Sequence, residues 1–406
     1  MSTQKKNGWN RRAVLAGMAG AAAMASVGRV AAQAKTPIRI GGTLALTGPL
    51  AQTSLIHKIT AEVYVELLNK RGGLLGRPVE YIVLDDQSKP EMARSLYEKL
   101  ITVDKVDLIM GPYGTGNILA AMGVAERYNK ILIQGTFGMP HLAKYPMQFP
   151  ASPIGPTPNK TVPTMVIDLL SKTKTPPKTV AVITSKFPSA HFISGGVKEA
   201  AEAKGMSLKM YLDYEFGTRD FGAIAARVKD ADPDFLWVGA LGLDSVQVLD
   251  ALKKIDYKPK RHYHLFAAPG PLVLSPEAGG ALSYSYFEEH EPFTKRPGVA
   301  EMVAGFRTKA KAAGVGYPYF DFQTASMMSM WQLLEKSVNA TKSLDDKKMA
   351  DWLKGNKVET ALGNMSFDGP NNHGPDQSKV KQVIDKKWVV VWPPEFAPPG
   401  VKPMLP

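Results

Sequence analysis

Short apolar runs alternate along the chain with longer segments in which apolar residues recur at helical spacing. The connections between them are short, and this alternation of buried strands with amphipathic helices is typical of an α/β fold with a parallel sheet. In the first part of the chain the pattern predicts strands at 38–46, 79–86, 106–110 and 131–134, and helices through 59–68, 90–103 and 117–129.

The alternation stops at a proline-rich stretch, residues 146–163, and then begins again. Six prolines in so short a segment favour a connection between domains over the interior of a helix or strand. After it the pattern predicts strands at 179–183, 208–214, 234–239 and 263–266, a loop at 187–192, and helices at 193–203, 221–228 and 245–255. The sequence therefore predicts two similar α/β lobes, each with a doubly wound parallel sheet, and a ligand cleft between them.

The last part of the chain carries a different pattern. Helices are predicted at 299–313, 322–338 and 347–354, followed by short strands with a hairpin turn at 368–374 and a final strand at 388–392. Residues 393–406 are predicted to form a proline-rich tail.

A glycine-rich loop follows the apolar strand 106–110 and leads into the next predicted helix. The loop runs from Gly111 to Asn117. Free backbone N–H groups and the helix dipole at such a junction favour an anion, and glycines allow it to come close. Thr115 and Asn117 are candidate N-caps or ligand donors. The loop matches neither a dinucleotide fingerprint nor a Gly-Lys-Ser/Thr phosphate loop, so on local grounds a simple turn without a ligand remains an equal alternative.

Residues 1–34 are predicted to be an export signal. Lys5, Lys6 and the pair Arg11-Arg12 precede a weakly apolar stretch, and Ala32-Gln33-Ala34 fits a cleavage site. The paired arginines favour the twin-arginine route over the general secretory route. The mature chain is therefore expected in the periplasm, without insertion into the membrane, because no run of 18 strongly apolar residues is present.

Charge and cysteine content narrow the functional classes further. The formal net charge is +13, and it falls to +8 without the export signal, which holds five basic and no acidic residues. No basic run is present, so no nucleic-acid partner is expected. The absence of cysteine excludes disulfides, thiolate metal sites and a lipid-anchored lipoprotein.

Isolated histidines and serines give only weak evidence for a metal site or a catalytic site. His262 and His264 alternate on a predicted strand without a third ligand nearby, so we expect surface or packed residues and no metal. His57 and His191 lie in or beside loops of the predicted cleft; contact of either one with the ligand is an alternative, but a solvated rim is favoured. Ser189 lacks the nucleophile-elbow pattern, and no paired acid–base set is present, so no enzyme activity and no cofactor are expected.

An ordered set of motifs resembles the periplasmic solute-binding proteins of the branched-chain amino-acid (leucine/isoleucine/valine-binding) type of ABC transporter. The resemblance covers 37–392 and is carried by Thr47–Ala51, Asn69–Val79, Asp85–Pro90, Gly111–Gly116, Arg219–Val228 and Asp232–Asp234.

The resemblance implies the type I periplasmic binding protein fold, in which two lobes open and close at a hinge. The implied crossings fall near 147–158, 282–287 and 362–367, which makes lobe 1 of 37–150 plus 287–362 and lobe 2 of 158–282 plus 367–392. It also implies a monomer that captures a small anionic solute and delivers it to an inner-membrane ABC permease. An exported enzyme and a ligand-sensing module of the same fold are the alternatives.

In such proteins the loops after the third and fourth strands hold the carboxylate of the solute. Carried over to this chain, the resemblance predicts the following ligand-binding residues, with Tyr113 as an added aromatic: Leu50, Thr53, Tyr113, Gly114, Thr115, Gly116, Thr136, Phe137, Gly138, Ser189, Leu241 and Gly270.

The acid that grips the α-ammonium group in relatives has no counterpart here. Its position falls at or beside Gly270, and the segment 267–272 contains no carboxylate. A buried ammonium group without an acid costs several kcal/mol. The sequence therefore favours a carboxylate ligand without an α-amino group, such as an aromatic, keto or hydroxy acid. The alternative is a branched-chain or other amino acid, with Asp244 as the acid, although Asp244 also suits a helix N-cap.

Overall fold

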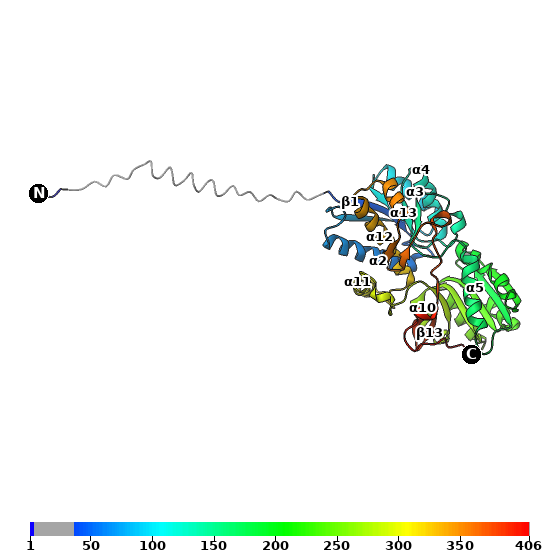
Figure 1. Ribbon diagram of the computed structural model, residues 1–406. Helices are drawn as coiled ribbons and strands as arrows, with labels where there is room; N and C mark the ends of the chain where they lie inside the picture. The colour runs from blue at the N-terminus through cyan, green and yellow to red at the C-terminus, as the bar shows by residue number, and fades with distance from the viewer. Residues whose placement is uncertain (4–35, 406) are drawn as a thin grey trace. The chain divides into compact units, whose positions relative to one another are not determined.

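The computed structural model describes residues 1–3 and 36–405. The export signal predicted at 1–34 thus falls, apart from its first three residues, outside the described part of the chain. The folded unit begins at Pro37 (Figure 1). No helix in the described residues is long and apolar enough to span a bilayer.

The first sheet is parallel and is built from the N-terminal strands. Its order is β2-β1-β3, and an isolated parallel bridge between Met110 and Ile133 extends it to β4 and β5. The strands and the helices between them are β1 Ile38–Leu44, α2 Ala51–Lys70, β2 Val79–Asp85, α3 Pro90–Thr102, β3 Leu108–Ile109, α4 Thr115–Arg127, β4 Leu132–Gln134 and β5 Gln148–Pro150.

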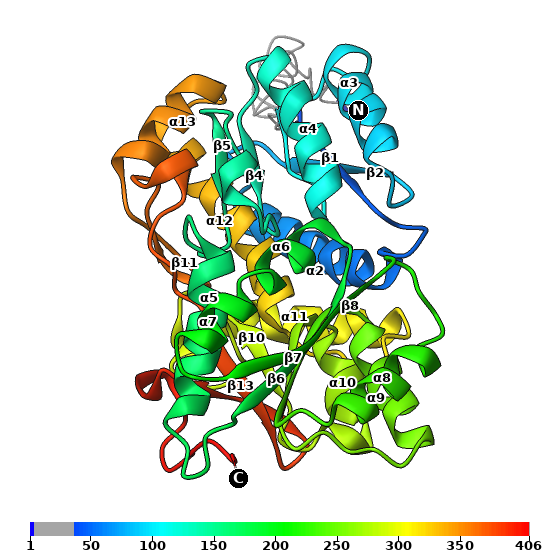
Figure 2. The same cartoon turned by 90° about the vertical axis from the view of Figure 1, so that its right-hand side faces the viewer.

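Helices from the last third of the chain pack against the part of the protein that contains this first sheet. In Figure 2, α12 lies between α13 and α2, and it also contacts β4. Trp331 is fully buried and lies between Tyr64 of α2 and Tyr81 of β2, with ring centroids 5.9 Å and 5.0 Å away. These helices, with the small hairpin that follows, are α11 Val299–Ala312, α12 Phe322–Thr341, α13 Asp346–Gly355, β11 Val358–Thr360 and β12 Gly363–Met365.

The second sheet has seven strands in the order β14-β13-β10-β9-β8-β6-β7. The five strands from β7 to β10 are parallel, and β13 and β14 add an antiparallel pair at one edge. Its elements are α5 Pro158–Ser171, β6 Thr179–Ser185, α6 Pro188–Ser194, α7 Val197–Glu202, β7 Ser207–Tyr214, α8 Gly222–Ala231, β8 Phe235–Gly242, α9 Asp244–Lys254, β9 His262–Ala267, α10 Pro269–Leu274, β10 Leu282–Ser285, β13 Lys379–Ile384 and β14 Lys387–Trp392. The predicted α/β class with two sheets is confirmed.

The chain passes between the two sheets three times. It leaves β5 of the first sheet for α5 and β6, leaves β10 for α11 and α12, and returns after β12 to β13. Where a hinge acts along these passages, and hence the lobe boundaries, stays a prediction.

The hairpin turn predicted at 368–374 is wrong. The turn of the last hairpin lies at Asp385 and Lys386, which both have positive φ and connect β13 to β14. In the predicted turn, Asn371 and Asn372 also have positive φ. Their side-chain amides, however, donate at 2.7–3.0 Å to the carbonyl oxygens of Pro140, Pro146 and Gln148, which lie between β4 and the start of β5. This segment therefore docks onto the first sheet and does not pair two strands.

The loop predicted at 187–192 is also wrong, because helix α6 begins at Pro188. Proline suits the first helical position, where its missing N–H is not needed. The predicted continuous helix is instead divided into α6 and α7 by Gly195 and Gly196. A β-carbon at Gly196 would lie 1.7 Å from the carbonyl oxygen of Asn159, so only glycine allows α5 to pass at this distance.

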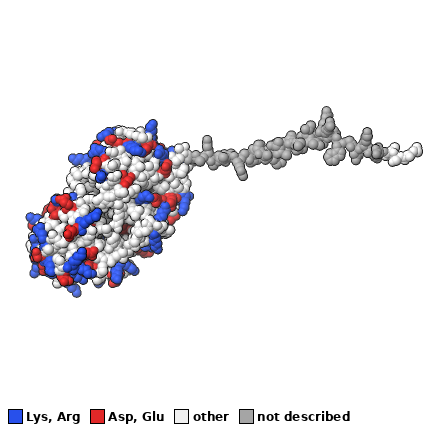
Figure 3. Space-filling model, turned by 180° about the vertical axis from the view of Figure 1, so that it is seen from behind, with Lys and Arg blue, Asp and Glu red and all other residues white. Residues whose placement is uncertain are grey.

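The proline-rich tail packs against the protein over the described residues. Phe396 stacks on Phe293 with ring centroids 5.7 Å apart, and Nζ of Lys379 lies 4.2 Å from the Phe396 ring centroid. On the surface, basic and acidic side chains are interspersed, and the middle of the face in Figure 3 is mostly free of both.

Candidate ligand-binding site

Strands of both sheets point their carboxyl ends at one cavity, which we call the Tyr113 cavity. Its volume is about 40 Å³. Loops beyond the carboxyl ends of parallel strands are where α/β proteins hold ligands. The lining residues, none of which is charged, are Tyr113, Gly114, Gly135, Thr136, Phe137, Gly138, Ser152, Ile154, Phe187, Ser189, Leu241, Phe266, Tyr286, Phe322, Gln323 and Ser326.

Most of the residues predicted to bind ligand come together here. Seven of them line this cavity, namely Tyr113, Gly114, Thr136, Phe137, Gly138, Ser189 and Leu241. Thr53 and Gly270 line a neighbouring cavity. Leu50, Thr115 and Gly116 line neither: Leu50 packs against Gly114, and Gly116 faces Pro90. That these residues bind a ligand stays a prediction.

The loop that leads into α4 lines the Tyr113 cavity through Tyr113 and Gly114. Gly114 precedes the helix with φ of 93°, which only glycine adopts without strain, and no side chain caps the first turn. The expectation that Thr115 or Asn117 caps it is therefore wrong. The hydroxyl of Thr115 is buried and has no hydrogen-bond partner among the described residues, and the amide of Asn117 lies beside Asp86.

Tyr113, His57 and Gln323 form a buried polar group at the edge of the cavity. Burial raises the pKa of Tyr113 to about 12, and the side chains of Thr53 and Gln323 lie within hydrogen-bonding reach of its hydroxyl. Burial lowers the pKa of His57 to about 4, so its ring is neutral, and it lies 4.8 Å from the Tyr113 ring. The solvated rim predicted for His57 is wrong. His191, by contrast, is about half exposed, 3.5 Å from Asp213.

The acceptor oxygen of Gln323 has no hydrogen-bond partner in the described part of the chain. The Gln323 side chain lies near the ring of His57, and this proximity opposes the fall in the pKa of His57. Nε2 of His57 and Oε1 of Gln323 are nevertheless both buried and without a hydrogen-bond partner among the described residues. Gln323 therefore places a carbonyl oxygen that accepts no hydrogen bond from the described residues at the edge of the Tyr113 cavity.

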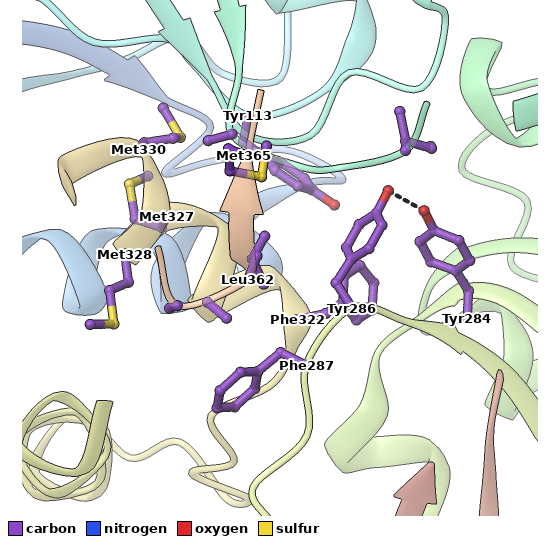
Figure 4. Packing of buried hydrophobic residues seen from close by; sticks show 14 of the residues in the cluster. Tyr113, Tyr284, Tyr286, Phe287, Phe322, Met327, Met328, Met330, Leu362 and Met365 are labelled. Atoms are coloured by element: carbon purple, nitrogen blue, oxygen red, sulfur yellow. Dashed lines mark hydrogen bonds between the residues drawn. The ribbon is translucent and has the colours of Figure 1, made fainter. Parts of the chain in front are cut away.

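The opposite wall is aromatic and comes from segments that no motif pointed to. Figure 4 shows the Tyr113 and Tyr286 side chains directed toward the same space, with Phe322 beside them and the Tyr286 hydroxyl bonded to that of Tyr284. Tyr286 follows β10, and Phe322 and Gln323 begin α12. Sequence analysis did not identify these residues because they are far along the chain from the glycine-rich loop and belong to no recognised motif.

A second cavity, which we call the Asp321 cavity, adjoins the first. Its volume is about 380 Å³, and it shares Phe266 and Gln323 with the Tyr113 cavity. It is lined by Gln52, Thr53, Leu55, Ile56, Phe266, Ala267, Ala268, Pro269, Gly270, Pro271, Leu274, Gly314, Val315, Gly316, Tyr317, Tyr319, Asp321 and Gln323.

Asp321 is the carboxylate of this second cavity, and it is only 2% exposed. It is the N-cap of α12: its Oδ1 accepts from the backbone N–H groups of Gln323 and Thr324, both at 3.0 Å. Burial raises the pKa of Asp321 to about 6, against a partial opposing effect of Lys381.

Asp244 neither lines a cavity nor caps its helix in the expected way. Leu243 is the N-cap of α9. The Asp244 carboxylate is buried and accepts a hydrogen bond of 3.0 Å from the Tyr214 hydroxyl. With Oδ2 already used, Asp244 is a poor candidate for a ligand's ammonium group.

His262 and His264 are packed in the core, with Nδ1 of one 2.8 Å from Nε2 of the other. Burial lowers the pKa of both rings. Within residues 36–405 no group of three His, Cys, Asp or Glu side chains is placed to hold a metal ion.

The raised pKa of Asp321 makes a prediction about stability. Because the folded-state pKa of about 6 lies above the ordinary 3.8, this carboxyl contributes stability that is full below pH 3.8 and lost as the pH rises through 6. The loss corresponds to about 3 kcal/mol at most. Asparagine caps helices as well as aspartate, so Asp321→Asn is expected to match the wild type near pH 4 and to be more stable above pH 7.

Urea unfolding of both proteins between pH 4 and 8 measures this difference. Buried histidines such as His57 lose stability as the pH falls, but they do so equally in both proteins, so the difference isolates Asp321. Parallel pH profiles for the two proteins would contradict the prediction.

The comparison with known proteins agrees with this geometry. A family model described as periplasmic binding protein matches residues 37–387. The leucine-, isoleucine-, valine-, threonine- and alanine-binding protein of Pseudomonas aeruginosa is 24% identical over 358 residues, which cover 86% of this chain and 90% of that protein.

Solved structures with the same fold include two of different ligand type. The branched-chain amino acid transporter substrate-binding protein of Streptococcus pneumoniae, in complex with isoleucine, has a TM-score of 0.73 at 18% identity, covering 87% of this chain and 98% of that one. A solute-binding protein of an ABC transporter from Rhodopseudomonas palustris, in complex with 3,4-dihydroxybenzoic acid, has a TM-score of 0.72 at 20% identity, covering 87% and 95%. With two α/β parts around one cavity and a family match over nearly all of the described chain, this chain belongs to the periplasmic binding proteins of the branched-chain amino-acid type.

Proposed function

We propose that this protein is the periplasmic solute-binding subunit of an ABC importer and that it captures a small carboxylic acid without an α-amino group. The observation that carries this proposal is the lining of the Tyr113 cavity, which offers hydrogen-bond donors but no carboxylate.

The donors suit a carboxylate. Gly114, which directly precedes the uncapped first turn of α4, lines the cavity together with Tyr113, Thr136 and Ser189, whose side chains carry hydroxyl groups. Helix N-termini and hydroxyls together stabilise a negative charge without a basic side chain.

An α-ammonium group would lie in the same cavity, because only one carbon separates it from the carboxylate. None of the described lining residues of the Tyr113 cavity is acidic, so the ammonium group would be buried without a counter-charge. The aromatic walls, from Phe137, Phe187, Phe266, Phe322 and Tyr286, instead suit an apolar or aromatic body. The fold neighbour that holds 3,4-dihydroxybenzoic acid shows that this fold accommodates such a ligand.

Matched pairs of ligands test the proposal by thermal shift of the mature protein. Leucine is compared with 4-methyl-2-oxopentanoate, and phenylalanine with 3-phenylpropionate, with benzoate as a shorter acid. A ligand at about 100 times its Kd adds about 2.7 kcal/mol of stability, enough to move the melting curve. We expect shifts with the acids and none with the amino acids. Recovery of the acid unchanged after incubation separates binding from enzymatic turnover.

A variant pair ties the shift to the Tyr113 cavity. Thr136→Val keeps the side-chain shape and removes a hydroxyl, and is expected to weaken acid binding about tenfold, as loss of one hydrogen bond to a charged group does. Thr308→Val, on the exposed side of α11, is the control. A shift with leucine instead of its oxo acid would favour the amino-acid alternative, as in the Pseudomonas aeruginosa relative, and would overturn the proposal.

A further inference from the structure

The two cavities adjoin each other and have lining residues in common. Phe266, at the end of β9, and Gln323, at the start of α12, line both of them. The smaller cavity holds the donors for a carboxylate, and the larger one, of about 380 Å³, has room for the rest of a ligand.

The Asp321 cavity carries a carboxylate, whereas none of the residues that line the Tyr113 cavity is charged. All the side-chain hydrogen bonds that Asp321 makes within the described residues go to Oδ1, from Gln323 and Thr324. Its other oxygen, Oδ2, has none. Oε1 of Gln323, a residue that lines both cavities, is a buried acceptor without a partner in the described part of the chain.

The charges around Asp321 leave it without a partner cation of its own. Glu288 pairs with Lys381, whose Nζ lies 2.6 Å from Oε1, and both side chains are fully buried. Glu289 pairs with Arg307. Three carboxylates thus face two cations, and Asp321 carries the excess negative charge at a cavity wall. A hydrogen-bond donor from a ligand would satisfy it.

The acid that relatives use for the α-ammonium group is predicted to fall at or beside Gly270, and the surroundings of Gly270 agree with a negative charge supplied from elsewhere. A β-carbon at Gly270 would lie 2.7 Å from the ring of Tyr317, so the absence of a side chain lets Tyr317 form a wall of the Asp321 cavity. The negative charge on this side of the site comes from α12, and not from the segment 267–272.

We propose that the solute is an elongated carboxylic acid whose carboxylate lies in the Tyr113 cavity and whose far end carries a hydroxyl or ammonium donor that binds Asp321. This inference rests on the proposed function, because it assigns the carboxylate to the same cavity, and it adds the chemical class of the distal group.

Three acids of nearly equal shape test the distal contact: 4-ethylbenzoate, 4-(hydroxymethyl)benzoate and 4-(aminomethyl)benzoate, with the matching 3-phenylpropionates as a longer set. Titration calorimetry at pH 7.5 gives the affinity of each for the wild type and for Asp321→Asn. In at least one set, we expect the wild type to bind a donor-bearing acid about tenfold more tightly than the ethyl analogue, as a charge-assisted hydrogen bond provides. In Asp321→Asn that ratio falls to about one.

Two further variants keep the test specific. Asp345 caps α13 in the same way but lines neither cavity, so Asp345→Asn is the matched control and should keep the wild-type ratio. A β-carbon at Gly316 would meet no atom within 4 Å, so Gly316→Leu should fold and fill part of the Asp321 cavity. It is expected to weaken the substituted acids and leave benzoate unchanged.

The outcomes separate this inference from the proposed function. Equal affinity of the wild type for donor-bearing and ethyl acids in both sets, or an unchanged ratio in Asp321→Asn, overturns the distal contact while leaving carboxylate binding intact. If Asp321→Asn weakens leucine in place of the substituted acids, Asp321 binds an α-ammonium group and both proposals are wrong. If no acid binds the wild type at all, the proposed function is wrong, and this inference is wrong as well because it depends on the proposed function.

Discussion

Gly138→Val is expected to weaken solute binding by at least about a hundredfold while leaving the melting temperature of the ligand-free protein almost unchanged. A β-carbon at Gly138, in the loop after β4 of the first sheet, would lie 2.6 Å from Cβ of Ser189, in the helix that follows β6 of the second sheet. Added methyl groups in a fixed core cost about 1–3 kcal/mol. With the predicted hinge between the lobes, the two parts separate to relieve the clash, so we expect the cost to fall on closure around the solute and not on folding.

Calorimetric titration and small-angle scattering check this result. The variant should keep the open, larger radius of gyration when the acid is added, whereas the wild type becomes more compact. Gly138→Val combined with Ser189→Gly removes the opposing β-carbon and should restore most of the affinity. Gly123→Ala, where a β-carbon meets no atom within 4 Å, is the control for added volume on the same part of the protein. Unchanged affinity in Gly138→Val would show that closure does not bring these residues together.

Lys381→Met is expected to lower the free energy of unfolding by about 3–5 kcal/mol, the usual effect of removing one member of a buried ion pair. Lys381 lies on β13, with Nζ 2.6 Å from Glu288 and 4.7 Å from the ring centroid of Trp388. Methionine keeps the apolar stem, so the loss comes from the charge. Without Lys381, both Glu288 and Asp321 would be buried without a neutralising cation.

Urea unfolding midpoints at constant slope measure this effect. The double variant Lys381→Met/Glu288→Gln should recover most of the stability, because no uncompensated charge remains at the pair. Lys295→Met breaks an exposed pair with Glu291, with side chains 69% and 63% exposed, and should change stability by less than about 1 kcal/mol. An equal effect of Lys381→Met and Lys295→Met would contradict the role assigned to burial.

Local sequence patterns predicted the framework because they depend on neighbours in the chain. The apolar strand 106–110 and the glycines after it predict a strand-to-helix junction, and parallel strands place all such junctions at one edge of a sheet. Tyr113, Gly114 and Thr136 therefore came together as expected, and Leu241 joined them from the second sheet.

The errors came from residues whose environment distant segments decide. His57 was expected at a rim, but the approach of Gln323 from α12 buries it beside Tyr113. Asp244 was expected to cap a helix or bind ligand, but the hydroxyl of Tyr214, at the end of β7, donates a hydrogen bond to its carboxylate. Nothing in the local sequence of either residue reports these partners.

The sequence by itself determined the α/β class, the family and the glycine-rich strand-to-helix junction of the first sheet, since periodicity, glycine positions and ordered motifs are local properties. Only the tertiary structure decided that Tyr286 closes the Tyr113 cavity and that Asp321 and Gln323 bring unused acceptors to the adjoining cavity. Whether a polar atom is buried, and whether it finds a partner, depends on contacts between segments far apart in the chain, and in this protein those contacts determine the polarity of the site.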